Sequence, residues 1–388
     1  GLDRDNPGNW TGLNIGYNYN MPNPDVTLSY FRIDGGGNYV QWPSAGLAIE
    51  SRYSGNINVS HGLLTNNGYN GVRISNLYGS STDSVYVNLS DIKVHGSGYD
   101  GFNISNINYT VLNIDDVQVK DGFWDGFRIN SNYYSKINLT GVSVKNYGDE
   151  AISFSSNQTY TTVEVQLSNF RNNSTRGGQY EILISGSYDY TNGGYTFNNN
   201  NFINQTSDYL VYTTSYGGGD DLDFTYNYWG AATTSEMDSL GSRTNISSIY
   251  DYHDYSSYSE IEYSNWLATA VLQPMNVELD NFNGVLGDTV MVGVHVTVPV
   301  DTHFISTEMT LTGFQDRLDF VGIETSGSTT GNANWTVVSN STDTSLYIAA
   351  AGANGISGAG MMFWVKLAIP DNDSTGLVPI HVESVLFN

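Results

Sequence analysis

Acidic side chains recur at a fixed interval between residues 70 and 150. Asp100, Asp125 and Glu150 follow one another 25 residues apart, and Asn70 occupies the equivalent place 30 residues before Asp100. Two carboxyl groups about 5 to 9 Å apart can serve as the acid and base of glycoside hydrolysis, and carboxylates are also ligands of Ca²⁺. The spacing therefore predicts a column of acids with two chemical interpretations, a carbohydrate face or an ion site.

Basic side chains recur beside the acids. Lys120 and Lys145 each lie five residues before an acid of the column. Arg73 and Arg128 are predicted to point outward, because their apolar neighbours on both sides alternate with them and take the interior. Acidic and basic columns together could bind carbohydrate or an ion. The interpretation that we favour is that the two columns neutralise each other, or that one Ca²⁺ bridges two repeats.

Other chemistry has weaker support in the sequence. Asp220, Asp221 and Asp223 follow a Gly-Gly-Gly turn and are candidate Ca²⁺ ligands, with a solvated loop as the alternative. The six histidines are scattered without ligand spacing, which argues against a metal-hydrolase centre. The chain has no cysteine, which excludes thiol catalysis and iron–sulfur clusters. We expect no catalytic residues and no cofactor other than a candidate Ca²⁺.

Composition limits the partners. The 388 residues include 14 Lys and Arg against 39 Asp and Glu, a net charge of −25. A charge of this sign and size repels phosphate backbones, so nucleic-acid binding is not expected. No apolar run approaches the roughly 18 residues of a membrane span, so we expect no membrane insertion by this chain.

The chain is rich in sequons, the Asn-x-Ser/Thr acceptors of N-linked glycans. It holds 14 of them, whereas its composition would give about 8 by chance. The excess fits a secreted glycoprotein, although Asn/Ser/Thr-rich repeats alone would also produce it. The candidate glycosylation sites are Asn9, Asn58, Asn88, Asn103, Asn108, Asn138, Asn157, Asn172, Asn173, Asn204, Asn245, Asn334, Asn340 and Asn372.

The elements that must position these residues are short repeated strands. Between residues 46 and 214 an apolar-x-apolar strand recurs seven times after a turn rich in Gly, Asn or Asp, and a second strand with period two accompanies it. Copies 25 or 30 residues apart indicate a solenoid, in which stacked coils close parallel sheets over a common core. No window offers the 3.6-residue period of a helix. One internal column is predicted to contain Ile49, Ile74, Ile104, Ile129, Phe154 and Ile184.

The end of the repeat carries a family resemblance. Its residues are Asn227-Tyr228-Trp229-Gly230, then Ile249-x-Asp251-x-x-Asp254, then Trp266-Leu267. Residues 21–268 resemble right-handed parallel β-helix proteins, and this end resembles the terminal coil of archaeal and bacterial surface proteins of that group. The resemblance implies a parallel β-helix with a terminal cap. Because polysaccharide lyases and hydrolases share the fold and carry acids and bases on its outer face, it also implies an enzymatic alternative.

A second domain follows, over residues 271–388. Longer alternating strands, such as Gly287 to Val296 and Met361 to Leu367, predict an antiparallel β-sandwich. The order of its segments resembles a cohesin-like module. Where that family usually has Tyr-Asp-Pro, this chain has Gly313-Phe314-Gln315-Asp316.

The predicted fold class is all-β, a right-handed parallel β-helix followed by a cohesin-like antiparallel sandwich. Residues 1–20 fit no coil of the repeat, so we predict that they extend onto a neighbouring subunit, the alternative being an irregular cap on their own solenoid. The predicted function is that of a structural extracellular glycoprotein, a self-assembling subunit of a cell-surface filament, sheath or S-layer whose partners are copies of itself and glycans. The alternative is a carbohydrate-binding or carbohydrate-degrading β-helix protein with a cohesin-like accessory domain.

Overall fold

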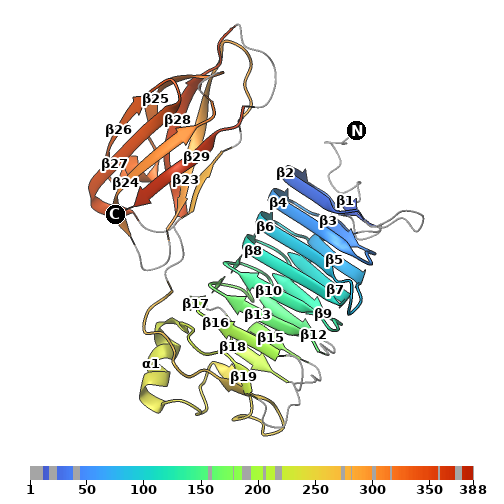
Figure 1. Cartoon of the computed structure of the whole chain (residues 1–388). Helices are drawn as coiled ribbons and strands as arrows, with labels where there is room; N and C mark the ends of the chain where they lie inside the picture. The colour runs from blue at the N-terminus through green and yellow to red at the C-terminus, as the bar shows by residue number, and fades with distance from the viewer. Residues whose placement is uncertain are drawn as a thin grey trace. The chain divides into compact units, whose positions relative to one another are not determined.

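A computed structural model describes residues 12–16, 24–37, 44–155, 160–177, 179–185, 194–203, 207–214, 221–271, 276–280, 282–298, 303–314, 317–356, 359–371 and 378–387. The chain divides into two compact units, Gly1–Val271 and Leu272–Asn388. The first unit is a parallel β-solenoid and the second an antiparallel sandwich, so the all-β fold class is confirmed (Figure 1).

The first sheet of the solenoid is built from the repeated apolar-x-apolar segments. Each of the seven predicted copies forms one strand, and a further strand lies at each end. In spatial order the strands are β1 (Leu13–Ile15), β3 (Ala45–Glu50), β5 (Asn70–Tyr78), β7 (Phe102–Asn108), β9 (Phe127–Asn130), β12 (Ile152–Ser155), β15 (Tyr180–Ile184), β18 (Tyr209–Thr213) and β20 (Ile249–Tyr250).

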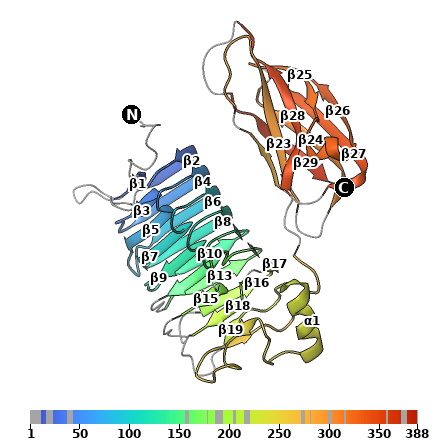
Figure 2. The same ribbon diagram turned by 180° about the vertical axis from the view of Figure 1, so that it is seen from behind.

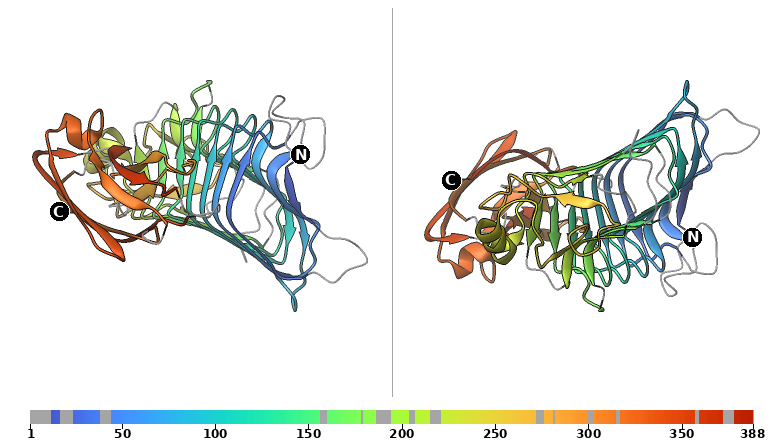
Figure 3. Two further views of the ribbon diagram at one scale, coloured as in Figure 1. Left: turned by 90° about the horizontal axis from the view of Figure 1, so that it is seen from above. Right: turned by 90° about the horizontal axis from the view of Figure 1, so that it is seen from below.

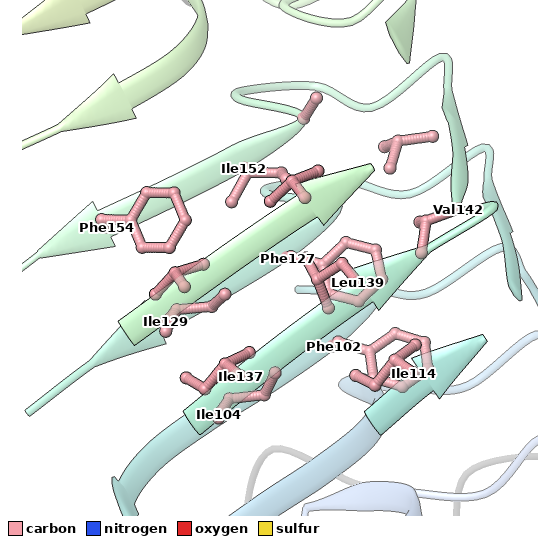
Figure 4. Packing of buried hydrophobic residues seen from close by; sticks show 14 of the residues in the cluster. Phe102, Ile104, Ile114, Phe127, Ile129, Ile137, Leu139, Val142, Ile152 and Phe154 are labelled. Atoms are coloured by element: carbon pink, nitrogen blue, oxygen red, sulfur yellow. The ribbon is translucent and has the colours of Figure 1, made fainter. Parts of the chain in front are cut away.

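The predicted register of this sheet is confirmed. Ile104 pairs with Ile74 on one side and Ile129 on the other, and Ile129 in turn pairs with Phe154. All of these side chains are fully buried, and Figure 4 shows Ile104, Ile129 and Phe154 following one another from strand to strand. Stacking in this register is what lets each short strand bury apolar side chains that a single coil would leave exposed.

The second sheet contains the companion strands. They are β2 (Val26–Asp34), β4 (Gly55–Thr65), β6 (Val85–His95), β8 (Thr110–Lys120), β10 (Lys136–Thr140), β11 (Ser143–Lys145), β13 (Thr162–Gln166), β14 (Asn169–Arg171), β16 (Gly194–Asn198), β17 (Asn201–Ile203), β19 (Asp221–Asp223) and β21 (Glu260–Glu262). The stacked coils are seen from two further directions in Figure 3.

Most coils bend in the middle of this second sheet. His61, Asp91 and Asp116 occupy equivalent places in β4, β6 and β8, and each has a positive φ, between 49° and 54°. The first half of β8 pairs with β10 and the second half with β11, because the next coil divides at Gly141, where φ is 64°. Left-handed residues at these corners turn the strand while both halves keep their apolar side chains inside.

The solenoid ends in a cap. Trp229 is buried and stacks on Phe202, with ring centroids 4.8 Å apart, and Asp251 accepts hydrogen bonds from the backbone N–H groups of His253 and Ile261. Helix α1 (Gly230–Leu240) follows Trp229 directly (Figures 1 and 2). It buries only Thr233, Thr234 and Met237, which explains why the sequence shows no helical apolar period there.

The start of the solenoid corrects one expectation. Leu13 and Ile15 pair in parallel with Leu47 and Ile49. Ile15 therefore extends the internal column that contains Ile49, and Leu13 extends the row that contains Leu47. The prediction that residues 1–20 fit no coil is therefore wrong for residues 12–16. The predicted contact of the remaining residues with a neighbouring subunit lies outside the described residues.

The second unit contains two antiparallel sheets. One orders β22 (Asn276–Leu279), β23 (Thr289–Thr297), β28 (Ala359–Ala368) and β25 (Asp319–Glu324); the other orders β26 (Thr336–Ser341), β27 (Ser345–Ile356), β24 (Phe304–Thr312) and β29 (His381–Phe387). Helix α2 (Thr329–Asn332) is a single turn. Buried Val292, Val294, Leu346 and Phe363 join one core, as the alternation in the sequence predicted.

Candidate functional site

The predicted acidic column forms, but inside the solenoid. Asp100 and Asp125 are 0% exposed and Glu150 is 6% exposed. The carboxyl oxygen Oδ1 of Asp100 accepts a hydrogen bond from the backbone N–H of Asp125, and the amide oxygen of Asn70 accepts one from that of Asp100. These residues precede the strands at a corner of each coil, where the alternation that places strand side chains does not apply. The prediction that Asp100 and Asp125 belong to an outward face is therefore wrong. They form a buried ladder whose hydrogen bonds join one coil to the next.

Arg128 neutralises part of this column. Its Nε donates to Asp125 Oδ2 at 2.8 Å and lies 3.7 Å from Asp100 Oδ1. Asn103, the register neighbour of Arg128, donates to the other oxygen of Asp100 at 2.8 Å. Arg73 stands in the same row and donates to Ser75 Oγ at 3.2 Å. The predicted outward arginines thus occupy the outer row of this sheet, and the side chain of Arg128 turns back to cover the buried acids.

Three carboxyl groups come closest to a metal site. Oxygens of Asp125, Asp149 and Glu150 lie within 4.8 Å of one another. Burial, together with the neighbouring Asp125, raises the pKa of Glu150 well above its ordinary range, and burial also raises the pKa of Asp149. The cluster contacts the Arg128 guanidinium and favours a proton on Glu150. On geometry these oxygens could hold Ca²⁺, but the cation would displace that proton and face that arginine.

A further buried acid extends the column by one coil. The backbone N–H of Ala151 donates to the carbonyl of Glu181, which continues the ladder, and the Glu181 side chain is 0% exposed. Asn173 Nδ2 donates to Glu181 Oε1 at 2.5 Å. Burial raises the pKa of Glu181 to about 8, so burial favours the protonated form of this carboxyl group.

Lys120 and Lys145 lie on the other sheet. They pair with each other in register, between His95 on one side and Arg171 on the other, so the basic column is real. Among the described residues, neither lysine forms an ion pair with Asp100, Asp125 or Glu150. The basic column of lysines therefore does not neutralise the acidic column, as we had expected. Arg128 pairs with the acids Asp100 and Asp125 instead.

The Gly-Gly-Gly segment is only partly described. Asp223 Oδ1 accepts hydrogen bonds from Thr225 N, from Thr225 Oγ1 at 2.7 Å and from Asn198 Nδ2. This carboxylate closes a local turn and ties it to the preceding coil. Asp220 and the side chain of Asp221 lie outside the described residues, so Ca²⁺ binding there stays a prediction.

Aromatic side chains stack along the same corner as the buried acids. Tyr69 stacks on Tyr99 with centroids 4.5 Å apart, Trp124 follows at 5.5 Å, and the Arg128 guanidinium lies 5.6 Å from the Tyr99 ring. Each ring belongs to the residue that immediately precedes a member of the acidic ladder in the sequence, so the rings recur at the same interval as the acids. Trp124 is 37% exposed.

A second ladder, on the outside of the other sheet, was missed by the sequence analysis. Asn138 Nδ2 donates to Asn113 Oδ1 at 2.6 Å, Asn113 to Asn88 at 2.8 Å, and Asn88 to Asn58 at 2.9 Å. Their spacings of 25, 25 and 30 residues are those of the apolar repeat. The signal was present, but Asn58, Asn88 and Asn138 were considered only as sequons.

This ladder leads into a hollow in the outer surface of the second sheet. The hollow has a volume of about 430 Å³, and its wall contains outward side chains of β8, β10 and β13 in two rows. One row is Asn113, Asn138 and Glu164; the other is Asp115, Thr140 and Gln166. We call this the amide groove.

The described sequons differ in their surroundings. Asn58, Asn245, Asn334 and Asn340 are exposed. Asn173 is 0% exposed and donates to Glu181 and to the carbonyl of Val144, so a glycan there would leave the folded structure without these bonds. The prediction that Asn173 is a candidate glycosylation site is therefore wrong. Asn88, Asn103, Asn108, Asn138 and Asn172 are half-buried, and Asn9, Asn157, Asn204 and Asn372 lie outside the described residues.

Neither described helix has the length and apolar character needed to cross a lipid bilayer. No family model matches the sequence, and no curated protein matches it.

Solved cohesin structures match part of the chain. A cohesin from a cohesin–dockerin complex of Clostridium thermocellum is 14% identical, with 29% of this chain and 83% of that chain covered and a TM-score of 0.26. A non-cellulosomal cohesin from the archaeon Archaeoglobus fulgidus is 16% identical, with 29% and 76% covered and a TM-score of 0.24. A cohesin module from a family 33 glycoside hydrolase of Clostridium perfringens is 18% identical, with 30% and 82% covered and a TM-score of 0.26. Similarities of this size do not indicate a shared partner.

Proposed function

We propose that this protein is a non-enzymatic structural subunit of an extracellular cell-surface assembly, a filament, sheath or S-layer, built from copies of itself. The observation that carries the proposal is how the solenoid uses its recurring polar side chains. The acidic ladder inside and the asparagine ladder outside both join one coil to the next. A protein whose repeated polar residues reinforce its own stack is suited to a mechanical role.

The acidic residues that suggested the enzymatic alternative are buried. A catalytic carboxyl group must reach the substrate within hydrogen-bonding distance. Asp100 and Asp125 are 0% exposed; Arg128 donates to one oxygen of Asp125, and Asn103 donates to one oxygen of Asp100. The acids that suggested a lyase or hydrolase thus have a structural explanation.

The surface chemistry supports an extracellular setting. The chain carries a net charge of −25, and exposed sequons occur in both units, at Asn58 and Asn245 in the solenoid and at Asn334 and Asn340 in the sandwich. Exposed sequons on a secreted chain are acceptors for glycans.

The test is the state of the protein in its native material. Electron microscopy and light scattering of protein extracted from the cell surface should show ordered polymers, and the purified full chain should form the same polymers at high concentration. A chain lacking residues 1–11, which keeps strand β1, tests the predicted role of the first residues. Native protein that is a free monomer overturns self-assembly, and release of sugar from a polysaccharide panel by the purified chain overturns the non-enzymatic role.

A further inference from the structure

The basic column of the second sheet has no ion-pair partner within its own unit. Lys120, Lys145 and Arg171 occupy equivalent places in β8, β11 and β14, so their backbones stack about 4.8 Å apart. Among the described residues, none of the three lies in an ion pair. The acid next to Lys120 in the sequence, Asp121, accepts a hydrogen bond from Asn146 Nδ2 at 2.9 Å. Three stacked positive charges against one carboxylate attract an anionic group from outside the chain.

The turns that follow these strands expose aromatic rings beside a fourth cation. Phe123 is 46% exposed and Trp124 37% exposed. The exposed Arg176 places its guanidinium 3.5 Å from the centroid of the Phe123 ring. The backbone N–H of Arg176 donates to the carbonyl of Gly148, and that of Gly148 to the carbonyl of Gly122, so the three turns are stacked. We call this surface the basic corner; it comprises Lys120, Phe123, Trp124, Lys145, Arg171 and Arg176.

The composition of the chain indicates what would meet this surface. Four of its 14 Lys and Arg lie in the basic corner, whereas the chain has 39 Asp and Glu. In an assembly built from copies of the chain, each neighbouring copy therefore presents a surface of the opposite charge. The exposed rings favour a protein partner over a bare polyanion, because aromatic side chains and arginine are enriched at protein interfaces, while a polyanion requires only cations.

We propose that the basic corner docks onto the acidic surface of a second copy of this chain. This inference rests on the self-assembly proposed above and names the surface that carries it. The basic corner and the acidic surface that it meets are different patches, so the contact is heterologous. A heterologous contact leaves one patch of each kind free at the ends of the assembly, which lets copies add one after another into an open polymer.

The decisive variant combines Lys120→Ala with Lys145→Ala. Both lysines alternate with buried valines, Val119 and Val144, and so lie on the outer face, where their loss should leave the thermal unfolding midpoint unchanged. We expect the association constant between copies to fall by about two- to thirtyfold, the effect of losing two exposed ion pairs. Phe123→Ala should lower it by about fivefold or more, as truncation of an aromatic residue at the centre of an interface does.

The matched control combines Lys136→Ala with Lys366→Ala. It removes the same number of lysines and gives the same net charge. Its two lysines lie outside the basic corner, and each already pairs within its own unit, Lys136 with Glu164 at 3.2 Å and Lys366 with Glu324 at 3.0 Å. A change that the control shares therefore reports net charge, and a change that it lacks reports the basic corner.

Self-association of the purified full chain is measured by sedimentation velocity and light scattering over a range of concentrations, and circular dichroism checks that each variant is folded. Weaker association of the Lys120→Ala, Lys145→Ala and Phe123→Ala chains, with a control that matches wild type, supports the proposal. Equal association of all the chains overturns it, as does wild type that stays monomeric at every concentration. A galacturonate oligomer that binds through the two lysines without weakening self-association also overturns it, because the basic corner would then serve an anionic polysaccharide.

The two proposals fail separately. Polymers in the native material, together with self-association that does not depend on the basic corner, refute this contact and leave the proposed function standing. Native protein that is a free monomer refutes the proposed function, while the purified variants still decide whether the basic corner binds a second copy.

Discussion

The buried acid Glu181 makes the stability of the solenoid depend on pH in an unusual direction. Burial raises its pKa to about 8 from the ordinary glutamate value of 4.5. Folding therefore favours the protonated form, and the stability that this group contributes is fully present below pH 4.5 and is lost as pH rises through 8. Most carboxyl groups in proteins behave the other way, because ion pairs lower their pKa.

The size of the effect follows from the shift. Each pKa unit corresponds to about 1.4 kcal/mol, so between pH 5 and pH 8 the free energy of unfolding should fall by about 3 to 4 kcal/mol through Glu181 alone. Glu150, whose pKa is raised in the same direction, adds to the fall. Glu181→Gln should remove the Glu181 contribution, because glutamine stays neutral and its Oε1 can still accept from Asn173 Nδ2.

The assay is urea unfolding of the full chain at pH 5, 6.5 and 8, followed by circular dichroism. Wild type and Glu181→Gln should have similar stability at pH 5, and the variant should be more stable by about 3 kcal/mol at pH 8. Asp208→Asn is the control, since Asp208 is exposed. Parallel pH profiles for wild type and Glu181→Gln would refute the reasoning.

Three other predictions follow from the packing. Ile129→Asp places an unpaired carboxylate in the internal column and should destabilise the solenoid by several kcal/mol; a melting curve like that of the parent would contradict the register. Arg128→Gln leaves Asp125 buried without its guanidinium and should cost about 3 to 5 kcal/mol, which Arg128→Gln combined with Asp125→Asn should partly restore; equal stabilities of the single and double variants in denaturant titrations would count against the pairing. Peptide mass spectrometry of native protein should find glycan at exposed Asn245 and none at buried Asn173, and a modified Asn173 would show that this coil is wrongly placed.

The acidic column shows where reasoning from the sequence stopped. The interval of 25 residues correctly predicted that Asp100, Asp125 and Glu150 stack, because parallel coils place equivalent residues side by side. It could not predict that they point inward. They lie at a corner, where the backbone leaves the extended conformation and side chains no longer alternate between the two faces. The same limit applies to Glu181, whose burial and contact with Asn173 join residues of the turn and the strand.

By itself the sequence determined the coils, their register and the composition of the core, because period-two apolar patterns repeated at 25 or 30 residues have a single arrangement that buries every copy. It also determined the sandwich, through the alternation at Val290 to Val296. Only the tertiary structure decided that the acidic row lies inside the solenoid, and that the asparagine ladder on the outer face ends at Asn138. Arg128 reaches two acids from neighbouring coils, and Asn138 meets Glu164 across a coil boundary. Whether two such side chains satisfy each other depends on their atoms meeting in three dimensions, which spacing along the chain does not specify.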